Sequence, residues 1–125
     1  MTDDQERVVT ALQAGLDEET AVRIAWAEAE TACPAAVLLP ARCIPVCTAA
    51  GETLLTEITQ SIRLTARSYA QLTRLAGQTE DAMLTLGYTL IDMKTDKGIP
   101  RSMMMQFSGI ADGERMHCQH QRIML

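Results

Sequence analysis

The spacing of hydrophobic residues predicts helices along most of the chain. Near the start, apolar residues recur on one helical face, which predicts a helix over residues 4–14 that ends at Gly15. Asp17 then suits the N-cap of a second helix running to about Cys33, where Pro34 would end it. The apolar residues of these two helices are Val8, Val9, Leu12, Leu16, Val22, Ala25, Trp26 and Ala29.

The clearest periodic signal lies in residues 50–76. Seven apolar residues there follow one another at spacings of 3, 4, 4, 3, 3 and 4, which is close to a heptad pattern and predicts one long amphipathic helix. Gly77 suits its end, and Thr79 suits the start of a further helix. The seven residues are Leu55, Ile58, Ile62, Ala66, Tyr69, Leu72 and Ala76.

Two segments have a different character. Residues 34–48 are apolar but hold three prolines, which indicates a buried connector or an exposed binding loop rather than a regular helix. Residues 82–93 predict a helix that returns along the long one, although Gly87 weakens the pattern. After a turn at residues 95–98, residues 99–125 fit either a β-hairpin or a short helix followed by a tail.

These patterns predict a single domain over residues 1–125 of the mainly α class. We expect a small helical bundle with one long amphipathic helix, to which a C-terminal β-hairpin could be added. An α+β fold is the alternative. The stretch LLTEITQSIRLTARSYAQLTRLA also resembles the C-terminal helical region of magnesium-chelatase-like ATPases in its Leu-x-Ala-Arg-x-Tyr pattern, but the chain has no GxxxxGK[ST] loop, so no family follows from it.

Composition and charge narrow the classes of partner. The net charge is −5, and residues 1–30 carry eight acidic residues against only Arg7 and Arg23. Since nonspecific nucleic-acid binding depends on neutralising phosphates, a nucleic-acid partner is disfavoured. The acidic front part indicates solubility or a basic partner. Eight methionines and only four aromatic residues predict an aliphatic core with adaptable side chains.

The sequence also bears on compartment. It has no apolar run of about 20 residues, the length that crosses a bilayer. The acidic N-terminus lacks the apolar core of a signal peptide. We therefore expect no membrane association, a cytoplasmic location, and four cysteines in the reduced state.

One short stretch, Met116 to His120, reads MHCQH and collects side chains that soft metals prefer. A metal site would need further ligands, and the other candidates lie in the proline-containing segment. The sequence therefore names Cys43, Cys47, His117, Cys118 and His120 as candidate ligands of a soft-metal or redox-thiol site. The alternative is that the cysteines are small buried apolar residues and the histidines belong to an exposed tail.

Catalytic motifs are missing from the sequence. It has no HExxH, no phosphate-binding glycine loop and no nucleophilic serine elbow, so we expect a non-enzymatic protein that uses no cofactor. Two groups are candidates for binding a partner. They are the arginines Arg63, Arg67 and Arg74, which would share one ridge of the long helix, and the methionines Met103, Met104 and Met105.

Three functions follow as hypotheses. The first is an acidic interaction module of the adaptor, chaperone, immunity or inhibitor type, which binds another protein through an apolar Met-bearing surface. The partner could also be a second copy of the chain, in a homodimer formed through the predicted long helix. The second is the soft-metal or redox-thiol protein. The third is a nucleic-acid-linked regulator that uses the three arginines, although these could instead pair with acidic residues of the same chain.

Overall fold

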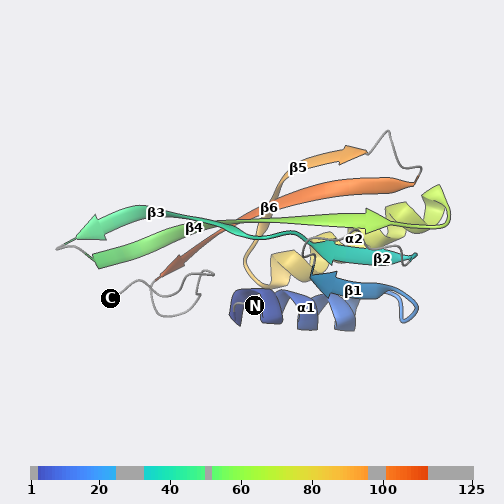
Figure 1. Ribbon diagram of the computed structural model, residues 1–125, viewed down its shortest axis with the longest axis horizontal. Helices are drawn as coiled ribbons and strands as arrows, with labels where there is room; N and C mark the ends of the chain where they lie inside the picture. Colours follow the sequence, from blue (N-terminus) through green and yellow to red (C-terminus); the bar gives the residue numbers. More distant parts are fainter. Residues whose placement is uncertain (1–2, 25–32, 50–51, 96–100, 113–125) are drawn as a thin grey trace.

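The structure, a computed structural model, describes residues 3–24, 33–49, 52–95 and 101–112 (Figure 1). In this part of the chain, six strands form one mixed sheet and two helices pack on it, so the fold is α+β. The prediction of a mainly α helical bundle is therefore wrong. The elements in chain order are α1 (Asp3–Gly15), β1 (Ala21–Ile24), β2 (Ala35–Leu38), β3 (Arg42–Ala49), β4 (Glu52–Thr65), α2 (Tyr69–Thr85), β5 (Thr89–Thr95) and β6 (Ser102–Asp112).

The long strand β4 organises the sheet. The strand order is β1-β2-β4-β6-β5, and β3 pairs with β4 as well. Because β2 pairs with residues 62–65 of β4 and β3 with residues 52–59, these two strands lie end to end along the same edge of β4. Only β1 and β2 run parallel, while the other pairs are antiparallel.

The predicted long helix over residues 50–76 is wrong because its apparent stripe spans two elements. Ile58 and Ile62 are four residues apart, which places them on one face of a strand as well as on one face of a helix. Even-numbered residues from 56 to 64 are buried and the odd-numbered residues between them are half-buried, so β4 alternates with period two. Buried Gln60 hides that alternation, because a polar residue stands where the pattern requires an apolar one.

The helix that the sequence does contain in this region begins at Tyr69. Ser68 is its N-cap, with its hydroxyl accepting a hydrogen bond from the Gln71 backbone N–H. The helix then continues through Gly77 and Thr79, where a break was predicted, to Thr85. Gly77 lies on the exposed face, where an added Cβ would meet nothing within 4 Å, so packing does not require a glycine at this position.

The other sequence predictions have mixed outcomes. The first helix is confirmed as α1. Instead of a helix from Asp17, the chain makes a turn and enters β1, while residues 25–32 lie outside the described part. The proline-containing connector forms β2, which is buried at all four positions, and β3, which has an irregular register after Pro45 as expected for a residue without an N–H.

The region after α2 is also a strand rather than a helix. Gly87 adopts a positive φ of 95°, which lets the chain reverse directly after α2 and enter β5. The predicted return helix over residues 82–93 is therefore limited to the end of α2. β5 and β6 then form an antiparallel pair. Of residues 99–125, for which a β-hairpin and a short helix with a tail were both predicted, residues 102–112 are strand β6, while residues 99–100 and 113–125 lie outside the described part.

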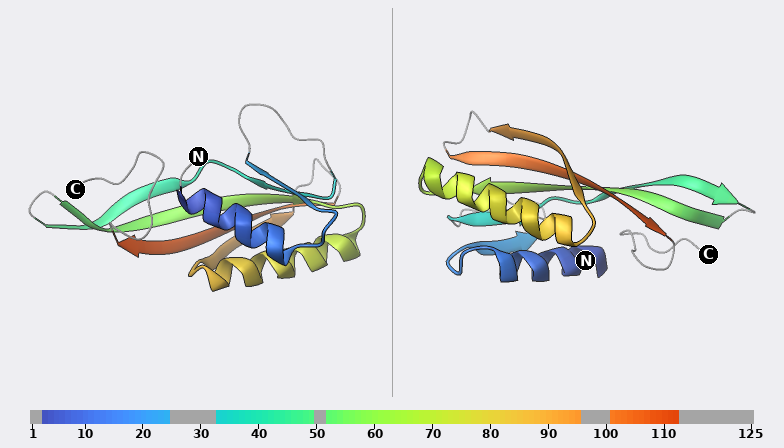
Figure 2. Two further views of the ribbon diagram at one scale, coloured as in Figure 1. Left: turned by 90° about the horizontal axis from the view of Figure 1, so that it is seen from below. Right: turned by 180° about the vertical axis from the view of Figure 1, so that it is seen from behind.

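Both helices pack on one side of the sheet (Figure 2), and the hydrophobic core lies between them and that face of the sheet. Phe107, with an exposed fraction of 0%, is the largest fully buried side chain among the described residues. Tyr88 closes the core toward β6, where its ring lies against Gly109 and leaves only 3.1 Å for an added Cβ. The core also includes Val8, Leu12, Leu16, Ala36, Leu38, Ile58, Ile62, Leu64, Ala66, Leu72, Leu75, Met83 and Met105.

A pair of buried amides stabilises the point where β2 ends and β3 begins. Gln60 donates from Nε2 to the carbonyl oxygens of Leu39 at 2.7 Å and Ser61 at 2.9 Å. Gln5 of α1 donates to the same Leu39 oxygen at 3.3 Å and contacts Gln60 Oε1 at 3.4 Å. The two amides supply the Leu39 oxygen with donors, and Gln60 adds a second donor to the Ser61 oxygen, which also accepts from the Leu39 backbone N–H at 3.0 Å.

One end of the sheet extends beyond the helices. The β3–β4 pair and the end of β6 project away from α1 and α2 (Figures 1 and 2). We call this part, residues 44–49, 52–57 and 110–112, the distal arm. It is built from the same strands as the core region, but the helix layer does not reach over it.

Candidate functional site

The distal arm carries a cluster of exposed apolar side chains. They come from three adjacent strands: Ile44 and Val46 from β3, Leu55 from β4 and Ile110 from β6. Their exposed fractions range from 38% for Leu55 to 57% for Ile110. Large apolar side chains that gather on one surface mark binding sites more often than scattered ones do. We call these four residues the arm patch.

The strand register places three members of the arm patch, Ile44, Leu55 and Ile110, on the sheet face opposite the helices, while Val46 lies at the register irregularity between Pro45 and Cys47. Ile44 and Ile110 both pair with Glu57, one from each side, so the three residues form a row across the sheet. Directly opposite residues in antiparallel strands project to the same face, and Leu55 lies on that face too because it is two residues from Glu57.

Glu57 gives the arm patch one negative charge at its centre. Its side chain is half-buried, and its Oε2 atom accepts a hydrogen bond from the Ser108 hydroxyl at 3.4 Å. A carboxylate flanked by apolar side chains offers a single directional contact within a surface that otherwise favours apolar groups. The patch therefore suits an apolar segment that carries one basic or hydrogen-bond-donating group.

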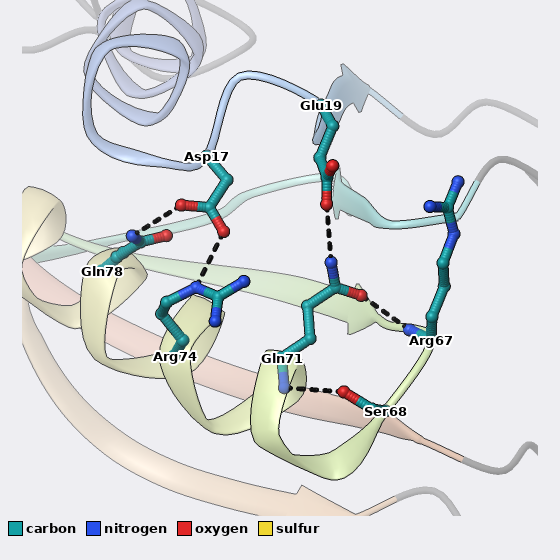
Figure 3. Close-up of polar contacts among 7 residues, drawn as sticks. All are labelled: Asp17, Glu19, Arg67, Ser68, Gln71, Arg74 and Gln78. Atoms are coloured by element: carbon teal, nitrogen blue, oxygen red, sulfur yellow. Dashed lines mark hydrogen bonds and ion pairs between the residues drawn. The ribbon is translucent and has the colours of Figure 1, made fainter.

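A second region of interest is polar: its side chains join the turn after α1 to helix α2 (Figure 3). Asp17 accepts hydrogen bonds from Arg74 Nε at 2.8 Å and from Gln78 Nε2 at 3.1 Å. Glu19 accepts from Gln71 Nε2 at 2.9 Å. We call these five residues the polar clamp, because they fix the α1–β1 turn on α2.

Within the polar clamp, the pKa of Asp17 is lowered from its usual value of 3.8. The main cause is the hydrogen bond from Gln78, followed by the hydrogen bond from Arg74, and both favour the charged carboxylate. A shallow cleft of about 560 Å³ lies here, lined by Asp17, Glu18, Glu19 and Arg74. Since its Asp17, Glu19 and Arg74 side chains bond to the protein itself, the polar clamp is a structural contact.

The three arginines named from the sequence lie in three different places. Arg63 lies on β4, Arg67 in the loop before α2, and Arg74 on α2, so they form no common ridge. Arg67 donates from Nη2 to the Cys33 carbonyl oxygen at 3.1 Å, and Arg74 forms its ion pair with Asp17. The alternative in which an arginine pairs with an acid of the N-terminal part therefore holds for Arg74.

The three methionines named from the sequence alternate along β6. Met105 is 1% exposed and belongs to the core, and Met103 is half-buried against it. Met104 pairs with Arg63 and is half-buried on the opposite face. A surface made of all three is therefore incompatible with a strand, since neighbouring side chains project to opposite faces.

The candidate metal ligands are only partly within the described residues. Cys43 is half-buried on β3, pairs with Ile58, packs against the core and is disulfide-bonded. Cys47 lies on the same strand and pairs with Leu55. His117, Cys118 and His120 lie outside the described part of the chain. Within the described part, no group of three or more His, Cys, Asp or Glu side chains is placed to hold a metal ion.

The bond at Cys43 corrects the expectation that all four cysteines are reduced; Cys33 is a free, exposed thiol. A metal site that includes Cys43 would require its thiolate, and therefore reduction of that bond. The metal hypothesis stays a prediction, which elemental analysis of untagged protein would test.

Sequence reasoning did not find the arm patch, although some signals were present. Ile44 and Val46 lie in the apolar, proline-containing segment 34–48, and Leu55 lies in the predicted helical stripe. The pattern Ser68-x-x-Gln71 is a recognised sign of a helix start, and it would have ended the supposed long helix before Tyr69. With residues 52–65 then open to be a strand, Leu55 and Glu57 would have fallen on one face.

Neither helix of the described chain is long and apolar enough to cross a membrane. No protein-family model matches this chain, and none of the curated proteins compared with it matches its sequence.

Proposed function

We propose that this protein is a non-enzymatic interaction module that binds another protein at the arm patch. The observation that supports the proposal is the exposure of Ile44, Val46, Leu55 and Ile110 on a part of the sheet that extends beyond the helices. Burying such side chains in a complex is favourable at about 25 cal/mol per Å² of apolar surface.

The partner contributes an apolar segment with a basic or donating group that meets Glu57. In many protein–protein interfaces a few central residues carry most of the binding energy. In this interface we expect the arm patch and Glu57 to be those residues. The predicted Met-bearing surface is replaced in this proposal by branched aliphatic side chains, because Met103 and Met105 face the core. Cytoplasmic location remains part of the proposal.

A photo-crosslinking amino acid at Ile110 tests the proposal in lysate of the source cells. The matched control carries the same amino acid at Thr10, which is exposed on α1. We expect a discrete product with another protein from the Ile110 position only, and a marked reduction of that product by Leu55→Ser. Products common to both positions, no product at all, or a product of two copies of this chain would contradict the proposal.

A further inference from the structure

The outermost strand β5 has a free edge. In the described part of the chain it pairs with β6 on one side and ends the strand order on the other. Thr89 and all residues from Ile91 to Thr95 are exposed, including the apolar Ile91 at 54% and Met93 at 47%. A free edge presents backbone N–H and C=O groups that can pair with another strand.

The charges on this edge complement a second copy of the same strand. Asp92 and Lys94 pair with Gln106 and Met104 of β6, so both project to the sheet face opposite the helices. Within one chain, Lys94 Nζ lies 3.7 Å from Asp92 Oδ2, and both side chains are exposed. Such a surface ion pair contributes little to stability, so both side chains can pair with charged groups of a second chain instead.

A two-fold axis limits how two such strands can align. Directly opposite residues must project to the same face, which leaves symmetric antiparallel alignments centred on Asp92, Met93 or Lys94 in this stretch. Centring on Asp92 places two carboxylates opposite each other, and centring on Lys94 places two ammonium groups opposite each other. Centring on Met93 places each Asp92 opposite the partner's Lys94, so charge selects one register.

We propose that β5 pairs with β5 of a second copy of this chain, antiparallel and centred on Met93, so that the two sheets become one. Residues 91–95 of each chain form the pairing. Met93 meets the partner's Met93 on the face that carries the helices, and two ion pairs form on the opposite face. This dimer differs from the one first predicted through the long helix, because that helix does not exist.

Sedimentation velocity of the full chain over a range of concentrations tests the dimer. We expect a species of twice the 13.7 kDa chain mass that gains population with concentration. A chain that remains monomeric at the highest soluble concentration would overturn the proposal.

Charge exchange tests the register. Asp92→Lys and Lys94→Asp each place like charges opposite one another twice in the dimer, and we expect about tenfold weaker dimerisation or more. The double variant with both substitutions restores the opposite charges and the net charge, so we expect its dimerisation within about threefold of the unmodified chain. Both side chains are exposed, so folding is preserved. Equal dimerisation in all variants, or no recovery in the double variant, would show that this register is wrong.

A crosslink locates the axis. Met93→Cys, made together with Cys33→Ser, places two thiols opposite each other at about 4.5–5.5 Å between Cα atoms, and we expect oxidation to join the chains. The matched control Thr89→Cys lies on the same strand. In this register, however, its thiol and the equivalent thiol of the second chain would be offset by eight residues, or about 26 Å at 3.3 Å per residue. Equal crosslinking of the two variants would overturn the proposal. The β5 edge is separate from the arm patch, so failure here leaves the proposed function untouched.

Discussion

Two regions of one sheet differ in what covers them. In the helix-covered region, β4 and β6 bury Ile58, Ile62 and Phe107 under α1 and α2. In the distal arm, the same strands continue with Leu55 and Ile110, which are exposed. The strands themselves change little between the regions, while the presence of the helix layer differs. We therefore expect the stability of the fold to depend on the first region and partner binding on the second.

Substituting one residue from each region of β6 should give the largest contrast. We expect Phe107→Ala to lower the free energy of unfolding by about 3–5 kcal/mol, because it empties a fully enclosed position. Ile110→Ala, three residues along the same strand, should change it by less than about 0.5 kcal/mol. Urea unfolding measures both.

If Phe107→Ala does not fold, Phe107→Leu provides a milder test, with an expected loss of about 1–2 kcal/mol. Equal effects at positions 107 and 110 would show that the distal arm is packed as firmly as the core.

The buried amide at Gln60 tests whether the helix-covered region depends on polar as well as apolar contacts. We expect Gln60→Leu to destabilise the protein by about 2 kcal/mol, since the Leu39 and Ser61 carbonyl oxygens lose a donor. Gln106→Leu, on the half-buried opposite face, is the matched control and should have a small effect. A gain in stability from Gln60→Leu would mean that apolar burial outweighs the hydrogen bonds.

Removing a single buried hydroxyl from α2 should raise the free energy of unfolding rather than lower it. Thr79 is 0% exposed, and among the described residues its Oγ1 atom has no hydrogen-bond partner. Thr79→Val keeps the shape and removes the unpaired polar atom, so we expect a gain of about 1 kcal/mol in thermal or urea unfolding. Thr79→Ser retains the hydroxyl and serves as the control; a loss of stability with Val would indicate a water or other partner at this atom.

The polar clamp should give the smallest effect, visible mainly as a pH dependence. The pKa of Asp17 is lowered in the folded protein, so its contribution to stability is present above pH 3.8 and is lost as the pH falls through the lower folded value. We expect Asp17→Asn to be less stable than the unmodified chain at neutral pH, and the difference to narrow at lower pH. Urea unfolding at several pH values measures it; a pH-independent difference would contradict the assigned cause.

Some elements were predictable because their signals are local. The helix α1 was predicted with nearly its observed bounds, since Val8, Leu12 and Leu16 lie on one face and Gly15 ends it. The change of conformation at Gly87 was signalled by a residue that accepts a positive φ. Asp17 was recognised as important for the wrong reason: it accepts side-chain hydrogen bonds from α2 instead of capping a helix.

Other elements could not be assigned because two structures satisfy the same spacing. Residues four apart share a face in both a helix and a strand, so Ile58 and Ile62 do not distinguish them. The β-branched threonines and isoleucines of β4 favour a strand, but this preference depends on neighbouring strands and is weak within one segment. Gln60 is acceptable inside only because Leu39, which is distant in sequence, supplies a hydrogen-bond acceptor.

Local sequence patterns account for the mainly aliphatic core, the acidic N-terminal part, the first helix and the reversal at Gly87, but not for the central place of Phe107 and Tyr88 in the core. The tertiary structure alone decided that residues 52–65 are a strand, because a strand is stable only when others pair with it. It also decided which apolar residues became core and which became the arm patch. Hydrophobicity favours burial, but the reach of two helices sets where along β4 and β6 burial stops.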